Sequence, residues 1–107
     1  MKKFRQSESG DRGWFVGAFE RAVYTTDQFE VAYMFDSAGT HSRRHYHQVA
    51  TEINLITSGC AVVNGEKISA GEGFIFEPLE QCEVYYPEDT YTLCVKTPSV
   101  PGDKYFI

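Results

Sequence analysis

Long apolar runs are missing from this sequence. No stretch of its 107 residues approaches the roughly 20 consecutive apolar positions of a membrane-spanning helix. The basic residues Lys2 and Lys3 are not followed by an apolar segment of signal-peptide length. We therefore expect no membrane partner and no secretory leader.

Positive charge is also scarce. Ten Lys and Arg residues face fifteen Asp and Glu, which gives a formal net charge of −5. The densest basic pair near the middle of the chain is Arg43 and Arg44, and no long basic run exists. Nucleic acid is therefore not an expected partner.

The sequence has only three cysteines, which is an odd number. Cys60, Cys82 and Cys94 are widely spaced, which does not suit the disulfide framework of a secreted protein. Free thiols in a reducing compartment fit this pattern, so we expect a cytoplasmic protein.

A sustained helical period is absent too, whereas aromatic residues are plentiful. Eight Phe, seven Tyr and one Trp favour strands, and short alternating segments separated by turns predict an all-β sandwich or barrel. The length indicates one domain. Polar residues 1–13 are expected to form a flexible N-terminal arm, followed by a β-barrel domain over residues 14–107.

Two strands show clear alternation. In residues 29–35, Phe29, Val31, Tyr33 and Phe35 share one face. In residues 51–58, Glu52 shares a face with Asn54 and Ile56, opposite Ile53 and Leu55. Further strands are expected at 14–19, 60–63, 66–69, 74–76, 83–86 and 91–96. Asn64 followed by Gly65 predicts a type I′ hairpin turn, and the apolar run 74–76 predicts a strand buried on both faces.

Ligand chemistry is concentrated in residues 39–59, which contain all three histidines. His45 and His47 are two residues apart, so on a strand their side chains share a face, about 6–7 Å apart at the backbone. Glu52 can join them only if the chain reverses near residues 48–50. The sequence therefore predicts such a reversal if the three side chains form one site.

The spacing of Gly39, His45, His47, Glu52 and Gly59 resembles the first signature motif of the cupin superfamily. This resemblance implies a small cupin-type β-barrel, also called a double-stranded β-helix or jelly roll. It also implies that His45, His47 and Glu52 bind one divalent metal ion inside the barrel.

The second cupin motif is degraded. Gly71 matches its first glycine, but four positions carry other residues: Glu77, Leu79, Cys82 and Tyr86. The fourth metal ligand is then Cys82, or Glu83 if the match slips by one residue, or water. Cys82 as a small buried hydrophobic residue is the competing interpretation.

Two imidazoles and one carboxylate suit Fe, Mn, Ni or Zn, and a thiolate from Cys82 would favour Zn or Fe. Around this site, His41 is a candidate for a supporting contact or a loop residue. One of Arg43 and Arg44 is a candidate for gripping a ligand carboxylate or phosphate, against the alternative of a solvated rim. A further group of aromatics is expected to line a pocket or pack in the core: Tyr33, Phe76, Tyr85 and Tyr86.

Three functions follow from the resemblance. The first is a metal-dependent enzyme, an isomerase, lyase or dioxygenase, acting on a small carboxylate or sugar-like molecule. The second is a non-catalytic module that binds or senses such a molecule, and the third is an accessory protein of polysaccharide or nucleotide-sugar metabolism. No catalytic residue is assigned. Because Ile53 and Leu55 face away from the site, a homodimer is also predicted.

Overall fold

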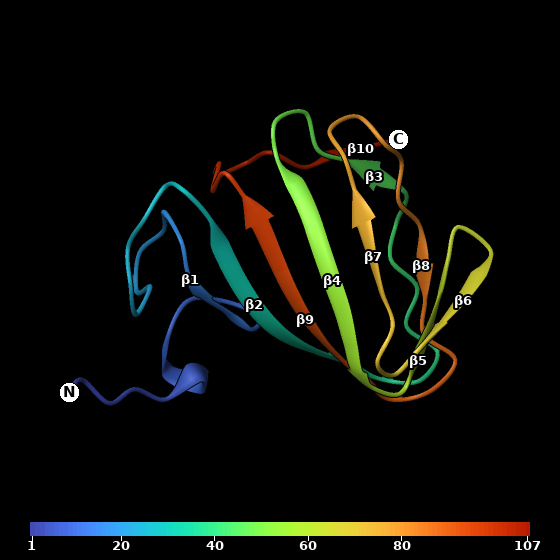
Figure 1. Ribbon diagram of the computed structural model, residues 1–107, viewed down its shortest axis with the longest axis horizontal. Helices are drawn as coiled ribbons and strands as arrows, with labels where there is room; N and C mark the ends of the chain where they lie inside the picture. The colour runs from blue at the N-terminus through green and yellow to red at the C-terminus, as the bar shows by residue number, and fades with distance from the viewer.

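The computed structural model describes all residues 1–107 and is built almost entirely of strands (Figure 1). Its only helical segment is a three-residue 3₁₀ helix, η1, and no helix is long and apolar enough to cross a membrane. The elements are η1 (Gln6–Glu8), β1 (Trp14–Val16), β2 (Glu30–Asp36), β3 (His45–Tyr46), β4 (Thr51–Ser58), β5 (Cys60–Val63), β6 (Glu66–Ser69), β7 (Gly73–Phe76), β8 (Val84–Tyr85), β9 (Thr90–Thr97) and β10 (Tyr105–Phe106). The predicted all-β fold is confirmed.

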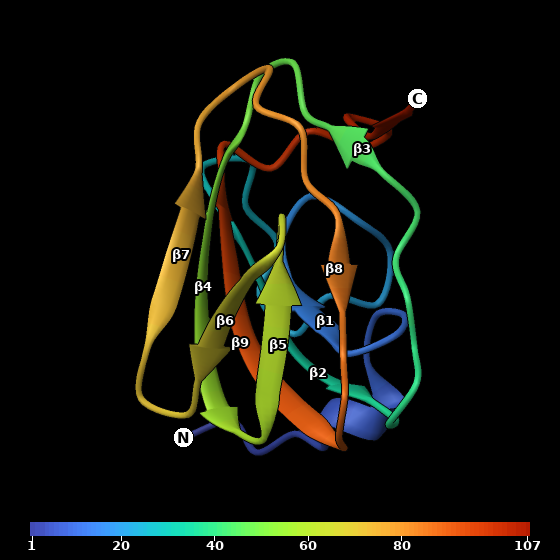
Figure 2. The same cartoon turned by 90° about the vertical axis from the view of Figure 1, so that its right-hand side faces the viewer.

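The strands form three antiparallel sheets. A five-stranded sheet has the order β1-β2-β9-β4-β7, a three-stranded sheet has the order β6-β5-β8, and β10 pairs with β3. Figure 2 shows β5, β6 and β8 standing in front of the large sheet, so that the two sheets enclose an interior. Strands close in sequence are often far apart in the sheets, and most of the contacts that hold the barrel are therefore long-range.

Alternation along β2 and β4 follows the prediction. Ala32 and Ile56 face inward and are fully buried, whereas Phe35, Ile53 and Leu55 face outward and remain 52%, 42% and 40% exposed. A strand places successive side chains on opposite faces of its sheet. The same alternation that directs Glu52 and Asn54 inward therefore leaves an apolar outer face.

The hydrophobic core fills one end of the interior. Its buried members come from both sheets: Ile56, Ala61, Val63, Phe76, Cys82, Val84 and Tyr86. The hairpin β5–β6 closes this end, and its turn residues Asn64 and Gly65 have φ values of +48° and +83°. Those values are the ones a type I′ turn requires, as predicted.

The prediction that residues 74–76 are buried on both faces is wrong. Phe76 is buried, but Ile75 is 58% exposed. The reason is that no second layer covers the outer face of the large sheet, where Ile53 and Leu55 of β4 are exposed as well. A continuous apolar run cannot distinguish this arrangement from a strand between two layers.

The C-terminal tail packs against the histidine strand. Tyr105 pairs with Tyr46 and Phe106 pairs with His45, and the rings of Tyr46 and Tyr105 stack with centroids 5.4 Å apart. The tail therefore supplies an edge strand next to the candidate site, although the chain termini lie at opposite ends of the molecule (Figure 1).

The N-terminal arm contacts the domain. The amide nitrogen of Gln6 donates hydrogen bonds of 2.8 Å to the carbonyl oxygens of both Gly13 and Tyr33, and Ser9 is only 8% exposed. The flexibility expected for residues 1–13 stays a prediction, but residues 6–13 have defined positions against β1 and β2.

At Gly59 the barrel leaves no room for a side chain. This glycine has φ +87°, and an added Cβ would lie 2.3 Å from the carbonyl oxygen of Asp89, whereas Gly39, at φ +90°, has open space around it. Left-handed backbone costs alanine about 1–2 kcal/mol at either position. We expect Gly59→Ala to lower the free energy of unfolding by roughly 3 kcal/mol or more, because the clash adds to that strain. Equal losses for Gly39→Ala and Gly59→Ala in urea would contradict this.

Candidate metal and ligand site

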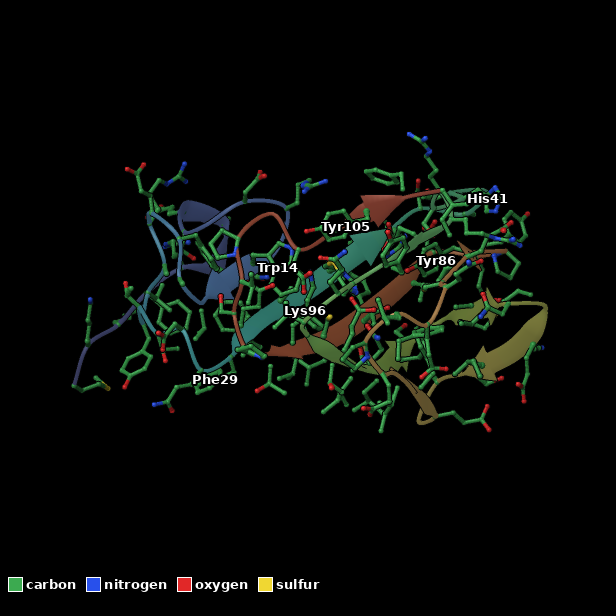
Figure 3. The ribbon with its side chains drawn as sticks, turned by 90° about the horizontal axis from the view of Figure 1, so that it is seen from above. Trp14, Phe29, His41, Tyr86, Lys96 and Tyr105 are labelled. Atoms are coloured by element: carbon green, nitrogen blue, oxygen red, sulfur yellow. The ribbon has the colours of Figure 1, made fainter.

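An open cavity of about 1010 Å³ extends from the interior of the barrel to the N-terminal segment, and all four predicted metal ligands line it. These are His45, His47, Glu52 and Cys82. Figure 3 shows Trp14, Lys96 and Tyr86, which also line the cavity, along the length of the molecule. The side chains on which the metal prediction rests therefore share one interior space.

The predicted chain reversal lies between β3 and β4. His45 belongs to β3, Glu52 is the second residue of β4, and His47 precedes the connecting turn. His45 and His47 are 7% and 4% exposed, and their ring centroids lie 5.5 Å apart with the planes nearly perpendicular. The reversal after the second histidine brings the carboxylate to the same cavity as both rings.

Burial favours the neutral form of both imidazoles. Burial lowers the pKa of both His45 and His47, although the charge of Glu52 opposes this effect. The Nδ1 atom of His45 lies 2.8 Å from the carbonyl oxygen of Arg43. Because a carbonyl only accepts, Nδ1 carries the proton, and Nε2 keeps its lone pair for a ligand.

Glu52 has few competing partners. Its only side-chain hydrogen bond is accepted from the Sγ of Cys94 at 3.6 Å, and it belongs to no ion pair. Its charge contributes to a raised pKa for the thiols of both Cys82 and Cys94, after burial as the larger cause. Glu52 is therefore available to a cation.

Cys82 lies directly opposite His45. The backbone N–H of each residue donates to the carbonyl oxygen of the other, at 2.8 and 3.0 Å. Burial, followed by the charge of Glu52, raises the pKa of Cys82 to about 12, and the residue also belongs to the hydrophobic core. Its position suits a fourth ligand, but without a cation its sulfur is a protonated thiol.

Glu83, the other candidate for the fourth ligand, does not line the cavity. Its carboxylate lies 3.0 Å from Nε2 of His41 and accepts a hydrogen bond of 3.1 Å from Nε of Arg44. The expected supporting role of His41 is therefore wrong, and Figure 3 shows this residue at the end of the molecule far from Trp14. The one-residue step from Cys82 reverses the side-chain direction on an extended chain.

Arg43 and Arg44 are also outside the cavity. Arg44 is held by Glu83, and the guanidinium of Arg43 lies over the ring of Phe106 at 4.7 Å. The cavity instead receives Lys96 and Lys104, which sequence reasoning did not assign. Lys96 shares the inward phase of Thr92 and Cys94 in β9, which is a signal in the sequence, whereas the position of Lys104 depends on the path of the tail.

Lys96 is held in place from two sides. Its ammonium lies 3.4 Å from a carboxylate oxygen of Glu30 and 4.8 Å from the ring centre of Trp14. The second oxygen of Glu30 accepts a hydrogen bond of 2.8 Å from the hydroxyl of Ser99. This ion pair therefore forms a fixed, mostly compensated part of the cavity wall.

Of the candidate pocket aromatics, Tyr86 is the one whose ring is buried in the cavity wall. Burial is the main cause that raises the pKa of Tyr86 and of its hydrogen-bond partner Asp36. Tyr85 is 43% exposed. Tyr33 bonds through its hydroxyl to Thr57 at 3.0 Å on the outer face. Phe76 packs in the core, as its alternative interpretation predicted.

The residue types fit a divalent metal, since two neutral imidazoles and a free carboxylate line one cavity. As the side chains stand, however, no three His, Cys, Asp or Glu side chains lie close enough together to hold one ion. Binding would therefore require side-chain rotations within the cavity. The metal ligands remain a prediction.

Comparison with solved structures identifies the fold. A protein with a double-stranded β-helix domain from Klebsiella pneumoniae matches with a TM-score of 0.72 and 18% identity over 98% of this chain and 90% of that chain. An RmlC-like cupin from Shewanella frigidimarina matches at 0.65 with 15% identity, over 71% of each chain. Oxalate oxidase in complex with the substrate analogue glycolate matches at 0.73 with 17% identity, over 99% of this chain and 63% of that one.

A scan against protein-family models gave no match, and neither did a sequence search of curated proteins. The structural matches are at most 24% identical, so they show the fold alone. The predicted cupin-type barrel is confirmed: the chain has the double-stranded β-helix fold of the cupins.

Proposed function

We propose that this protein is a small cupin that binds one divalent metal ion and a small polar molecule in its barrel. His45, His47 and Glu52 would hold the ion, with Cys82 or water as the fourth ligand. The observation that carries the proposal is that these side chains line a single cavity, with a neutral His45 whose Nε2 is free.

Fe, Mn, Ni and Zn all suit this donor set. A bound ion would supply Lewis-acid chemistry to an oxygen of the ligand, or dioxygen activation if it is iron. The chain's own contribution is to orient His45 through the carbonyl of Arg43 and to enclose the ligand between the two sheets. An isomerase, lyase or dioxygenase remains the proposed class of enzyme.

Metal analysis tests the first half of the proposal. We expect one divalent ion per chain after purification without chelator, and Glu52→Ala to weaken Zn²⁺ affinity at least 100-fold, since a first-row metal loses one of three strong ligands. Glu83→Ala is the matched control, because its carboxylate faces His41 and Arg44. Full metal content in Glu52→Ala would end the assignment.

Cys82 decides whether the fourth ligand is a thiolate or water. Without a cation the pKa of its thiol is raised to about 12, and a fourth position held by water is the one that a catalytic metal site keeps open for a substrate. If the thiolate does ligate, Zn²⁺ titration releases one more proton from wild type than from Cys82→Ala. Equal proton release in calorimetry, measured in buffers of different ionisation enthalpy, would assign the fourth position to water.

The ligand is proposed to be a small carboxylate or sugar-like molecule. Oxalate oxidase with bound glycolate has the same fold, which supports a small oxygen-rich ligand. No side chain specifically favours a role in polysaccharide or nucleotide-sugar metabolism, which is the remaining alternative. We retain the prediction of a cytoplasmic protein, supported by three free cysteines that are all buried.

We also propose a homodimer formed through the outer face of the large sheet. The exposed apolar residues of this face, called the outer patch below, are Tyr33, Phe35, Ile53, Leu55, Ile75 and Tyr91. No charged residue occupies the outward positions of β2, β9, β4 and β7 that surround them. A continuous exposed apolar surface of this kind marks an interaction site.

A further inference from the structure

Two polar side chains inside the barrel have no hydrogen-bond partner. They are Asn54, at its amide nitrogen, and Thr92, at its hydroxyl oxygen. The two residues are only 6% and 2% exposed. A buried polar atom without a partner destabilises a fold, and native proteins contain few of them. Of the two residues only Asn54 lines the cavity, so its amide nitrogen indicates a partner that the chain itself does not supply.

Asn54 and Thr92 are neighbours on the inner face of the large sheet. In the pairing of β4 with β9, Asn54 is opposite Cys94 and Ile56 is opposite Thr92. Asn54 and Thr92 are therefore diagonal neighbours with side chains on the same face. Along β4, Asn54 lies between Glu52 and Ile56, where the cavity meets the hydrophobic core.

The same cavity contains an uncompensated cation. Lys104 lines it but belongs to no ion pair, and its ammonium lies 5.4 Å from the ring centre of Phe106. Lys96, by contrast, is paired with Glu30. An N–H donor and a free ammonium in one cavity complement an anion with oxygen acceptors.

We propose that Asn54 forms the inner end of a subsite for a small carboxylate. The Asn54 amide donates to an oxygen of the ligand and Lys104 pairs with its negative charge, since both residues line the cavity, whereas Thr92 lies behind its wall. This inference rests on the proposed function, in which the cavity takes a small molecule and Glu52 is neutralised by a cation. It adds the class of ligand and the residues that select it.

Calorimetric titration of the full-length chain with succinate, and with neutral succinamide of the same length, tests the subsite. We expect succinate to bind and succinamide to bind at least ten-fold more weakly. Asn54→Leu keeps the size of the side chain and removes the amide, so it should weaken succinate binding about ten-fold or more. Thr92→Val, whose side chain does not line the cavity, should leave succinate affinity within about two-fold of wild type.

The stability of the variants provides a second measurement. Because Asn54 and Thr92 lack partners for these atoms, Asn54→Leu and Thr92→Val should leave the melting temperature unchanged or raise it. Asn64→Ala is the matched control. Its amide donates to Gln81 and accepts from the N–H of Glu83, each at 2.9 Å, so it should lower the melting temperature and leave succinate affinity unchanged.

The role of the Lys104 charge is tested by comparing Lys104→Met with Lys67→Met. Lys67 is an exposed residue of β6 on the surface of the hairpin. The first should weaken succinate binding about ten-fold, and the second should not change it. The Zn²⁺ affinity of Asn54→Leu should stay within three-fold of wild type, which separates the subsite from the metal ligands.

The outcomes are distinguishable. Unchanged succinate affinity in Asn54→Leu would overturn the subsite while the proposed function stands. Binding of neutral sugars such as xylose, without binding of succinate, would overturn the carboxylate class alone. Failure of wild type to bind any carboxylate or sugar of a C2–C6 panel would overturn both this inference and the proposed ligand-binding function.

Discussion

Asp103→Ala is expected to lower the free energy of unfolding by about 3 kcal/mol or more, and to weaken Zn²⁺ binding 10- to 100-fold. The carboxylate of Asp103 accepts hydrogen bonds from three successive backbone N–H groups, those of Gln48, Val49 and Ala50, at 2.9 to 3.3 Å. These residues form the reversal between His47 and Glu52.

The reason for both effects is that this turn has no other anchor of similar strength. Asp103 is only 7% exposed, so its bonds are shielded from water. Removing the carboxylate leaves three N–H groups to find other partners, of which that of Ala50 belongs to a residue only 2% exposed. The turn would then no longer fix the direction in which Glu52 enters the cavity.

The same carboxylate makes stability depend on pH. Burial raises the pKa of Asp103, but the N–H groups of Ala50, Gln48 and Val49, together with His47, lower it, and the net result is below the ordinary value of 3.8. A depressed folded-state pKa contributes stability that is fully present above 3.8 and is lost as the pH falls through the lower folded value.

Urea unfolding between pH 5 and pH 2 measures this contribution. The difference in stability between wild type and Asp103→Asn should shrink as the pH falls below 3.8. Asp11→Ala is the control, because that side chain is 83% exposed beside Arg12 and should change stability by less than about 0.5 kcal/mol. A difference that stays constant to pH 2 would show that the Asp103 charge does not support the turn.

Leu55→Lys is expected to convert a homodimer into a monomer, with at least a 100-fold rise in the dissociation constant. Leu55 is in the outer patch and is 40% exposed, and it pairs with Leu93 on one side and Gly73 on the other. A lysine there would bury an unpaired charge in a symmetric apolar interface.

The chemistry of the outer patch supports self-association. Tyr91 stacks on Tyr33 at 5.5 Å and contacts Phe35 at 5.0 Å, so the aromatic half is rigid, and Ile53, Leu55 and Ile75 form an aliphatic half. A stable interface needs about 800 Å² from each partner. In the proposed dimer, two copies related by a two-fold axis would bury the same face.

Sedimentation equilibrium across a concentration range tests the dimer. Wild type should have twice the chain mass of 12.2 kDa, and Leu55→Lys should have the chain mass. Leu79→Lys is the control, since Leu79 is 64% exposed in the turn between β7 and β8, away from the outer patch. A monomeric wild type at the highest concentration would refute the proposal.

Much of the site could be read from the sequence, because local spacing on a strand fixes side-chain direction. The interval from His45 to His47 places both on one face, and the alternation of residues 51–58 correctly separated Glu52, Asn54 and Ile56 from Ile53 and Leu55. Resemblance to the cupin motif then supplied the chain reversal that periodicity alone does not contain.

Tertiary structure decided the rest, because it depends on contacts between residues distant in the chain. The inward position of Lys104 and the anchoring of the turn by Asp103 follow from the path of the tail beside β3. The outward direction of Glu83 follows from its contacts with His41 and Arg44. The sequence by itself determined which face each strand presents, since a period of two is a local property of the backbone. Which strands became neighbours, and so which charges share the cavity, was decided only by long-range pairing.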